Sequence, residues 1–360
     1  MNPEAGRGAP LTVMVRVNDS KPLPFIMDTG AGMTDLDSSL EPQLGTRIGN
    51  ASVANFGVLL SGGAYRPPRL YLGDTPLETG IYVATLDFKR WFKDPRCPYM
   101  GILGIDVLKH YCVQLDFQSG KVRFLDAARA DKKDWGRPFH LTYTWSDCMI
   151  IDENLTGAKG AHSMLDTGDN ADGFLTPKLY QQWTNQSAPL ANGEFRSPNG
   201  TLGGEMYHDL DLVGLQKSQL DNHTRFNTIG LHVLSENLVT FDFPERTMYL
   251  KRTSDWPLLD KETQAATDSV GQSAADFSHS LRVKGQLPGW TTNDVPENGV
   301  AHWTHQTNGL DLVTLDEQKK GGSSVYHYTF TRQTQSSPWK LEKAWLTDQG
   351  EKTIEEYPVP

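Results

Sequence analysis

The chain has 360 residues, of which 38% are hydrophobic, 22% charged and 10% aromatic, which is typical of globular domains and excludes a mostly disordered protein. Its 44 acidic and 34 basic residues give a formal net charge of −10, so no overall basic field exists to attract nucleic acid. No run approaches the roughly 18 to 20 apolar residues of a membrane helix. We therefore expect a globular protein with no membrane span and no nucleic-acid partner.

A short motif occurs twice. Asp28-Thr29-Gly30 follows an apolar run that ends at Met27, and Asp166-Thr167-Gly168 follows a second apolar run 138 residues later. A single Asp-Thr-Gly is common turn chemistry and carries little weight. Because a repeat decides the fold of a chain, the match must extend along both copies before it is meaningful.

The match continues downstream of both motifs. Apolar residues lead into Gly104 in the first copy and into Gly230 in the second, and an aspartate follows each glycine by 12 residues, as Asp116 and Asp242. The equal offsets indicate that the chain contains two copies of one β-rich unit. We expect Asp116 and Asp242 to have structural roles, because each stands at the start of a hairpin.

Local patterns predict the elements between these landmarks. Val107-Leu108 and Val233-Leu234 predict a short buried helix after each glycine. Alternating residues predict a closing strand in each copy, at Lys121–Phe124 and Thr247–Leu250. Paired glycines, Gly62-Gly63 in the first copy and Gly203-Gly204 in the second, are typical of the tip of a mobile hairpin.

These signals divide the chain into three parts, and the fold class they predict is mainly β. The first lobe covers residues 1–133 and the second 134–254. From residue 255 to 360 the pattern changes to a helix-compatible stretch at 260–282 followed by alternating strands, such as Val325–Arg332 and Trp339–Thr347. We expect this part to be a small α+β domain, of an NTF2-like or cystatin-like kind, and its role stays open.

The repeated motif has a specific chemical use. Two Asp-Thr-Gly loops can face each other closely because glycine carries no side chain. Two carboxyls in contact cannot both ionise cheaply, so they share one proton and titrate as a unit. The ionised member can then activate a water while the protonated member binds a carbonyl, which is general acid-base hydrolysis of an amide.

On these residues the sequence resembles the aspartic protease superfamily. The alanine that follows the first motif, Ala31, and the short lobes are closer to retropepsin-like domains than to the longer pepsin lobes. Two such lobes in one chain are similar to bacterial aspartyl protease family proteins with tandem retropepsin-like lobes. The resemblance covers roughly residues 11 to 254.

The resemblance implies a role for each matched residue. Asp28 and Asp166 would form the catalytic pair, Thr29 and Thr167 would interlock the two loops, and Gly30 and Gly168 would allow their close approach. The segments that end at Gly104 and Gly230 would pack beneath the loops. The hairpins at Gly62-Gly63 and Gly203-Gly204 would be flaps that close over an extended peptide.

The resemblance also implies a setting for the activity. The substrate would be a peptide or protein, cleaved by a monomer with an intrachain active site. No cofactor is implied, and we expect no metal, because Cys97, Cys112 and Cys148 are too few and too scattered for a metal site or a disulfide framework. Bacterial relatives of this kind are commonly exported, so we expect an extracytoplasmic protein, periplasmic or secreted, although the chain shows no signal peptide.

Two positions depart from the pattern of acid-active relatives. Many of those enzymes place Ser or Thr after Asp-Thr-Gly, where a hydroxyl can bond the carboxylate and lower its pKa, whereas this chain has Ala31 and Asp169. Ala31 predicts activity nearer neutral pH. If Asp169 points inward, it raises the pKa of the pair further; if it points outward, it caps the turn. Asp35 and Asp37, close to the first motif, are expected to cap the local turn.

The sequence therefore predicts an aspartic endopeptidase, with two alternatives. In the first, the lobes keep the fold and the groove but act as a catalytically inactive module for peptide binding or assembly. In the second, lobe 1 dimerises between chains, as isolated retropepsins do, and lobe 2 is a degenerate partner. The distance between the carboxyls of Asp28 and Asp166 separates these possibilities.

Overall fold

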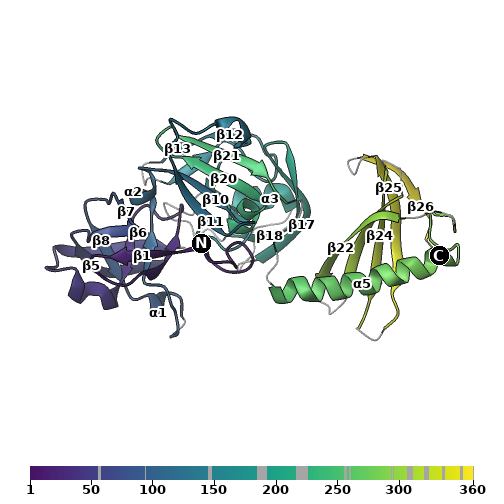
Figure 1. Cartoon of the computed structure of the whole chain (residues 1–360), viewed down its shortest axis with the longest axis horizontal. Helices are drawn as coiled ribbons and strands as arrows, with labels where there is room; N and C mark the ends of the chain where they lie inside the picture. Colours follow the sequence, from purple (N-terminus) through teal and green to yellow (C-terminus); the bar gives the residue numbers. More distant parts are fainter. Residues whose placement is uncertain are drawn as a thin grey trace. The chain divides into compact units, whose positions relative to one another are not determined.

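The computed structural model describes residues 1–55, 58–93, 95–144, 148–184, 193–215, 226–254, 258, 261–292, 294, 296–305, 311–319, 324–334, 337–348 and 352–359. The chain separates into two compact units, Met1–Leu259 and Asp260–Pro360 (Figure 1). With 44% strand and 16% helix, the protein is mainly β, as expected.

The N-terminal half of the first unit is built on one large mixed sheet. Its strand β1 (Thr12–Val17) alternates in burial, so that the side chains of Val13, Val15 and Val17 face the core. In spatial order, the described strands are β4 (Gly49–Asn55), β5 (Val58–Tyr65), β8 (Val83–Leu86), β3 (Asp35–Asp37), β9 (Gly101–Leu103), β2 (Leu23–Met27), β1, β6 (Leu70–Leu72) and β7 (Thr75–Leu77). The helices of this half are η1 (Ser38–Gln43), α1 (Phe88–Trp91) and α2 (Ile105–Leu108).

The following half of the first unit repeats part of this plan with smaller sheets. One sheet has the order β13 (Thr142–Tyr143), β14 (Met149–Ile151), β15 (Ser163–Leu165) and β19 (Asn227–Ile229). Another has the order β16 (Gly173–Leu175), β18 (Glu205–Gly214) and β17 (Gly193–Leu202). Its helices are α3 (Pro177–Thr184) and α4 (Leu231–Ser235).

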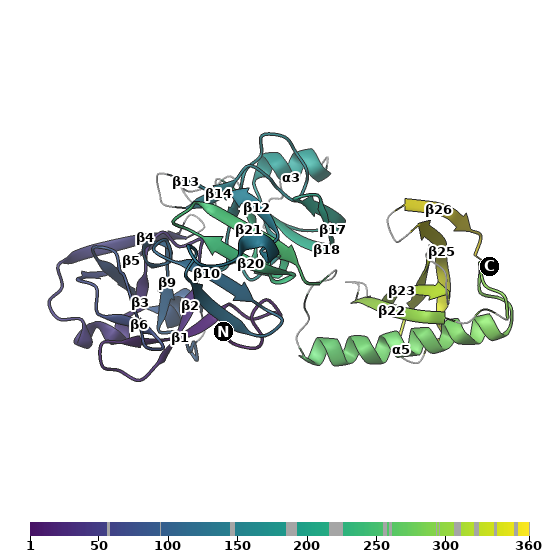
Figure 2. The ribbon, with the colours of Figure 1, turned by 45° about the horizontal axis from the view of Figure 1, so that its top comes forward.

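A sheet with strands from both halves joins them (Figure 2). Strands β10 and β20 pair antiparallel at its centre, and Gln114 lies directly opposite Thr240. Both residues follow the glycine of their own copy by ten positions, so the two copies meet about a local pseudo-twofold axis. The full order is β11 (Lys121–Leu125), β10 (Cys112–Asp116), β20 (Asn237–Asp242), β21 (Thr247–Arg252) and β12 (Arg137–His140), with η2 (Lys132–Asp134) before β12.

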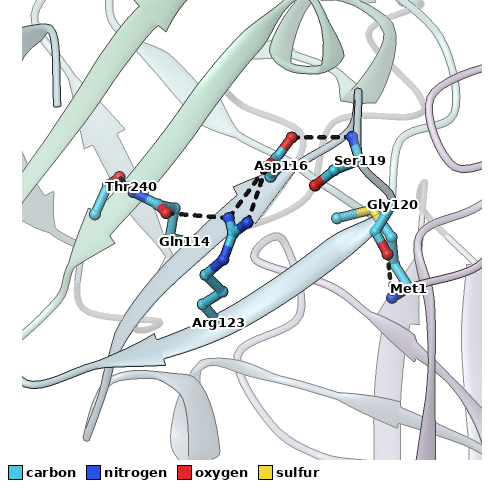
Figure 3. A network of polar contacts seen from close by, with 7 residues as sticks. All are labelled: Met1, Gln114, Asp116, Ser119, Gly120, Arg123 and Thr240. Atoms are coloured by element: carbon cyan, nitrogen blue, oxygen red, sulfur yellow. Dashed lines mark hydrogen bonds and ion pairs between the residues drawn. The ribbon is translucent and has the colours of Figure 1, made fainter. Parts of the chain in front are cut away.

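Polar side chains hold this junction (Figure 3). The Gln114 amide donates to the Thr240 hydroxyl at 3.0 Å, and Arg123 donates both to the Gln114 carbonyl oxygen, at 3.3 Å, and to Asp116, at 3.1 Å. Asp242, with a fully buried side chain, pairs with Lys132 at 2.7 Å. Asp116 and Asp242 therefore have structural roles, as the sequence predicted.

One apolar cluster continues through both halves of the first unit. It includes Leu103 and Ile105 from the first copy and Ile229 and Leu231 from the second, all fully buried. The strands that carry the repeated motifs are thus anchored in a common core, which limits their movement relative to each other. Among the described helices of the chain, none is long and apolar enough to cross a membrane.

The second unit is one long helix followed by an antiparallel meander. The helix α5 (Lys261–Val283) contacts the first two strands of the sheet. The strands follow one another in sequence order as β22 (Pro296–His305), β23 (Asp311–Lys319), β24 (Ser324–Arg332), β25 (Lys340–Asp348) and β26 (Lys352–Tyr357). The helix and the strands expected in this part of the chain are confirmed.

Candidate active site

The two Asp-Thr-Gly loops leave equivalent strands. Strand β2 pairs in parallel with β9, and β15 pairs in parallel with β19. The amide of Asp28 donates to the carbonyl of Leu103 at 3.0 Å, and the amide of Asp166 donates to the carbonyl of Ile229 at 3.1 Å. Each aspartate is therefore fixed by the segment that leads to the distant glycine of its own copy.

Each carboxyl is oriented by its own loop. Oδ1 of Asp28 accepts from the amides of Gly30 at 2.7 Å and Ala31 at 3.1 Å. Oδ1 of Asp166 accepts from the amides of Gly168 at 2.9 Å and Asp169 at 3.1 Å. Two backbone donors on one oxygen fix the plane of each carboxyl before any ligand binds.

The threonines of the two motifs tie the loops together across the interface of the copies. The Thr29 hydroxyl accepts from the Thr167 amide at 3.0 Å and donates to the Leu165 carbonyl at 2.8 Å. In the reciprocal arrangement, the Thr167 hydroxyl accepts from the Thr29 amide at 3.0 Å and donates to the Met27 carbonyl at 2.7 Å. Both threonines are buried, so these four bonds are shielded from water.

The glycines of the motifs provide the space for this approach. A Cβ atom on Gly30 would lie 2.5 Å from Oδ1 of Asp166, and a Cβ atom on Gly168 would overlap the carboxyl of Asp28. No side chain fits at either position without moving the opposite carboxyl. The structure thus brings Asp28 and Asp166 together within one chain, with each lying over the glycine of the other loop.

A side-chain hydrogen bond joins the carboxyls of Asp28 and Asp166, and such a bond requires a proton. Burial raises the pKa of Asp166 well above its usual value, and the charges of Asp28 and Asp169 raise it further. The pair therefore keeps one proton over a wide pH range and titrates as a unit.

Asp169 points inward, which decides between the two orientations left open by the sequence. Asp169 is only 8% exposed, and its Oδ2 accepts a hydrogen bond from the Thr228 hydroxyl at 2.9 Å. Burial raises the pKa of Asp169 to about 7, and the charge of Asp28 contributes to the increase, against the hydrogen bond from Thr228. A third carboxyl thus belongs to the site, in the position that Ala31 occupies in the first copy.

The distant glycines, Gly104 and Gly230, pack directly against the loops. A Cβ atom on Gly104 would clash with the carbonyl of Met33, and one on Gly230 with the carbonyl of Ala171. The residues that follow them donate to the loops: the amide of Ile105 to Ala31 at 2.8 Å, and that of Leu231 to Asp169 at 2.7 Å. These contacts agree with the expected placement of both glycines beneath the loops.

Asp35 does not cap the local turn, so that expectation is wrong. It is 2% exposed, and its Oδ1 has no hydrogen-bond partner among the residues that the structure describes. Burial, followed by the charges of Asp106 and Asp28, raises the pKa of Asp35 well above its usual value. Asp37 does cap, since it accepts from the amide of Ser39 at 3.0 Å at the start of η1.

Asp106 and Thr34 were not singled out in the sequence. The Thr34 hydroxyl donates to Asp106 at 2.8 Å and accepts from the Gly104 amide at 3.2 Å, which ties the first loop to α2. Burial raises the pKa of Asp106. Asp106 does follow Gly104 by two residues, but His232 stands at the matching position of the second copy, so the repeat gives no signal.

Gly62 and Gly63 lie inside a strand, so they do not mark a hairpin tip. In β5 they are opposite Ala51 and Asn50 of β4, and the pairing of the two strands continues as far as Asn55 and Val58. A Cβ atom on Gly62 would collide with the carbonyl of Thr85 in β8. Gly62 is needed because the β4–β5 hairpin lies close to β8. The glycine therefore serves packing.

Gly203 and Gly204 do form a tight turn, between β17 and β18, with φ values of +66° and +83°. The Gly203 amide donates to Glu153 at 2.8 Å, and its carbonyl accepts from Arg137 in β12. The structure thus seats this turn against the shared sheet. The two glycine pairs are not equivalent, and their similar spacing from the motifs was coincidental.

The chain matches no protein-family model and no curated protein.

Proposed function

We propose that this protein is an aspartic endopeptidase whose first unit is built of two retropepsin-like lobes. The observation that carries the proposal is the reciprocal contact of the two loops. The hydroxyl of each motif threonine bonds the amide of the other, and each aspartate lies over the glycine of the opposite loop. This contact supports a catalytic pair within one chain, so no second copy of the chain is required.

The geometry favours hydrolysis without a covalent intermediate. The ionised member of the Asp28–Asp166 pair takes a proton from a water, whose oxygen attacks the peptide carbonyl carbon. The protonated member donates its proton to the carbonyl oxygen, and a tetrahedral diol forms. The carboxyl that received the proton then passes one to the leaving nitrogen as the C–N bond breaks. The other carboxylate takes a proton from a hydroxyl of the diol, which leaves the product as a carboxylic acid and restores the singly protonated pair.

The substrate of the proposal is an extended segment of peptide or unfolded protein. Such a segment would lie between the loops and the β4–β5 hairpin, which would serve as the flap. Strand β5 pairs with β8, and β8 with β3, which places the hairpin in the same sheet as the strands around Asp28. The turn at Gly203-Gly204 forms no part of this flap, because it is bound to Arg137 and Glu153.

The test is cleavage of an unstructured protein by the full chain across pH 3 to 8. We expect wild-type protein to cleave it, and a peptide inhibitor that carries a hydroxyl in place of the scissile carbonyl to stop cleavage. Asp28→Asn and Asp166→Asn should each lower kcat by about 10²- to 10⁴-fold, the usual contribution of general acid-base catalysis. Asp152→Asn, an exposed change in the same half as Asp166, is the matched control.

A different result would support the alternative of an inactive peptide-binding module. Tight binding of the hydroxyl peptide with no cleavage at any pH would show that the groove is present without the chemistry. Unchanged turnover in Asp28→Asn would show that the assigned pair is not responsible for any cleavage observed.

A further inference from the structure

The two sides of the Asp28–Asp166 pair differ at equivalent positions. Ala31 and Asp169 are equivalent, because each follows its Asp-Thr-Gly and each carbonyl accepts from the helix behind it. Ile102 and Thr228 are equivalent by strand register, since Ile102 lies opposite Ile26 in the first copy and Thr228 opposite Met164 in the second. An apolar pair in the first copy thus corresponds to a polar pair in the second.

On the first side, the apolar pair is part of a larger apolar wall. Ile102 is 3% exposed and packs in a cluster with Ile26, Leu86 and Phe88, against which Ala31 is also packed. A substrate side chain that reached Ala31 and Ile102 would meet hydrocarbon.

On the second side, the polar pair is connected by a hydrogen bond. The Thr228 hydroxyl donates to Oδ2 of Asp169 at 2.9 Å and itself accepts from the Phe174 amide at 2.6 Å. A backbone hydrogen bond from Ala171 also reaches the Asp169 carboxyl. These neutral donors hold the carboxyl in place, but within the described residues no Lys, Arg or His forms an ion pair with it.

We propose that Asp169 is a specificity-determining residue, which selects substrates with a lysine or arginine side chain on the second-copy side of the scissile bond. This inference rests on the proposed peptidase function and goes beyond it. The cation would complete a site that already contains an oriented carboxyl, and it would offset the mutual repulsion of Asp28, Asp166 and Asp169. At the matching positions of the first side, Ala31 and Ile102 carry no charge.

The burial of the site increases the selectivity. A charge pair in a partly desolvated site interacts far more strongly than one in water. A neutral side chain of equal length would bury the same hydrocarbon there but would leave the carboxyl without its counter-ion. We therefore expect discrimination between lysine and norleucine, which differ only in the terminal group, rather than a general preference for long side chains.

The test uses the full chain at pH 7 and a set of peptides in which one lysine moves along a neutral sequence, each paired with its norleucine counterpart. Mass spectrometry of the products locates the cleaved bond. Lysine should be preferred at positions on one side of that bond only, with kcat/KM about tenfold or more above the norleucine peptide, as a charge-assisted hydrogen bond predicts. Asp169→Asn should bring the lysine-to-norleucine ratio of kcat/KM to about one, whereas Asp152→Asn should leave the ratio unchanged.

Each remaining outcome overturns the inference. Equal cleavage of the lysine and norleucine peptides by wild-type protein refutes the selectivity but leaves the peptidase function intact. A lysine preference that persists in Asp169→Asn assigns it to another residue. If Asp169→Asn does not fold, the double variant Asp169→Ala/Thr228→Ile, which reproduces the first-copy pair, must lose the preference. No cleavage of any peptide refutes the peptidase function, and the inference with it.

Discussion

Thr29 and Thr167 are bonded to each other's backbone, hydroxyl to amide, at 3.0 Å in both directions. Each hydroxyl also donates to a buried carbonyl of the opposite copy, so each side chain satisfies one donor and one acceptor that water cannot reach. The position of one loop therefore depends directly on the other, and the threonines couple folding of the two copies to assembly of the site.

Replacing Thr29 with valine keeps the shape of the side chain but removes its hydroxyl. The Thr167 amide and the Leu165 carbonyl lose their buried partner, which should destabilise the protein by about 2 to 4 kcal/mol. Thr29→Ser retains the hydroxyl and should cost less. Chemical denaturation of both variants checks this, and equal losses for serine and valine would mean that the methyl group, not the hydrogen bonds, is what matters.

Asp169→Asn should shift the pH dependence of cleavage. The charge of Asp169 raises the pKa of Asp166, so removing this charge lowers the pH at which the pair gives up its shared proton. Activity requires that proton, and the alkaline limb of the pH–rate profile should therefore move to lower pH. The relative loss should be greater at pH 8 than at pH 5, on a neutral peptide.

Asp152→Asn serves as the control for this shift, because its side chain is 82% exposed and pairs with His162 at the surface. An alkaline limb that moves equally in both variants would reflect the net charge of the protein. If the alkaline limb of the pH–rate profile did not move in Asp169→Asn, Asp169 would have no effect on the titration of the Asp28–Asp166 pair.

The duplicated motif could be predicted from the sequence because its parts are local or equally spaced. The short helix and the closing strand of each copy were confirmed as α2 and β11, and as α4 and β21. A buried apolar pair after a glycine gives a clear pattern over few residues.

The rest depended on contacts between distant segments. Asp35 and Asp37 look alike in the sequence and are both buried, but Asp37 caps η1, whereas Oδ1 of Asp35 has no hydrogen-bond partner among the described residues. The pairing of β3 with β8 and β9 decides this difference. The direction of Asp169 depends on Thr228, 59 residues away. The glycine at position 62 is explained by Thr85, which no local pattern connects to it.

Asp35→Asn should stabilise the protein at neutral pH. Because burial raises the folded-state pKa of Asp35 above its unfolded value, the wild type loses stability as pH rises from about 4 through the folded pKa. Each pH unit in that window costs up to about 1.4 kcal/mol. The asparagine variant avoids this loss, so its advantage in thermal midpoint should grow between pH 4 and pH 8.

Asp37→Asn provides the opposite control. This carboxylate accepts hydrogen bonds from the amides of Ser39 and Phe88 and from the Ser39 hydroxyl. Asparagine would weaken these bonds, so Asp37→Asn should destabilise the protein at neutral pH. If the stability of the wild type rose between pH 4 and pH 8 as steeply as that of Asp35→Asn, the ionisation of Asp35 would not destabilise the folded protein.

Gly30→Ala should lower kcat by about 100-fold while leaving most of the fold intact. The new Cβ atom would lie 2.5 Å from Oδ1 of Asp166, so the opposite carboxyl must move or rotate. A displacement of this kind in a catalytic pair costs about 100-fold in kcat.

Gly49→Ala is the matched control, because a Cβ atom there meets no atom within 4 Å. Steady-state cleavage of a peptide, with circular dichroism as the measure of folding, checks the pair of variants. Full activity in Gly30→Ala would mean that the two carboxyls need not be in contact, and the shared proton on which the mechanism depends would have to be abandoned.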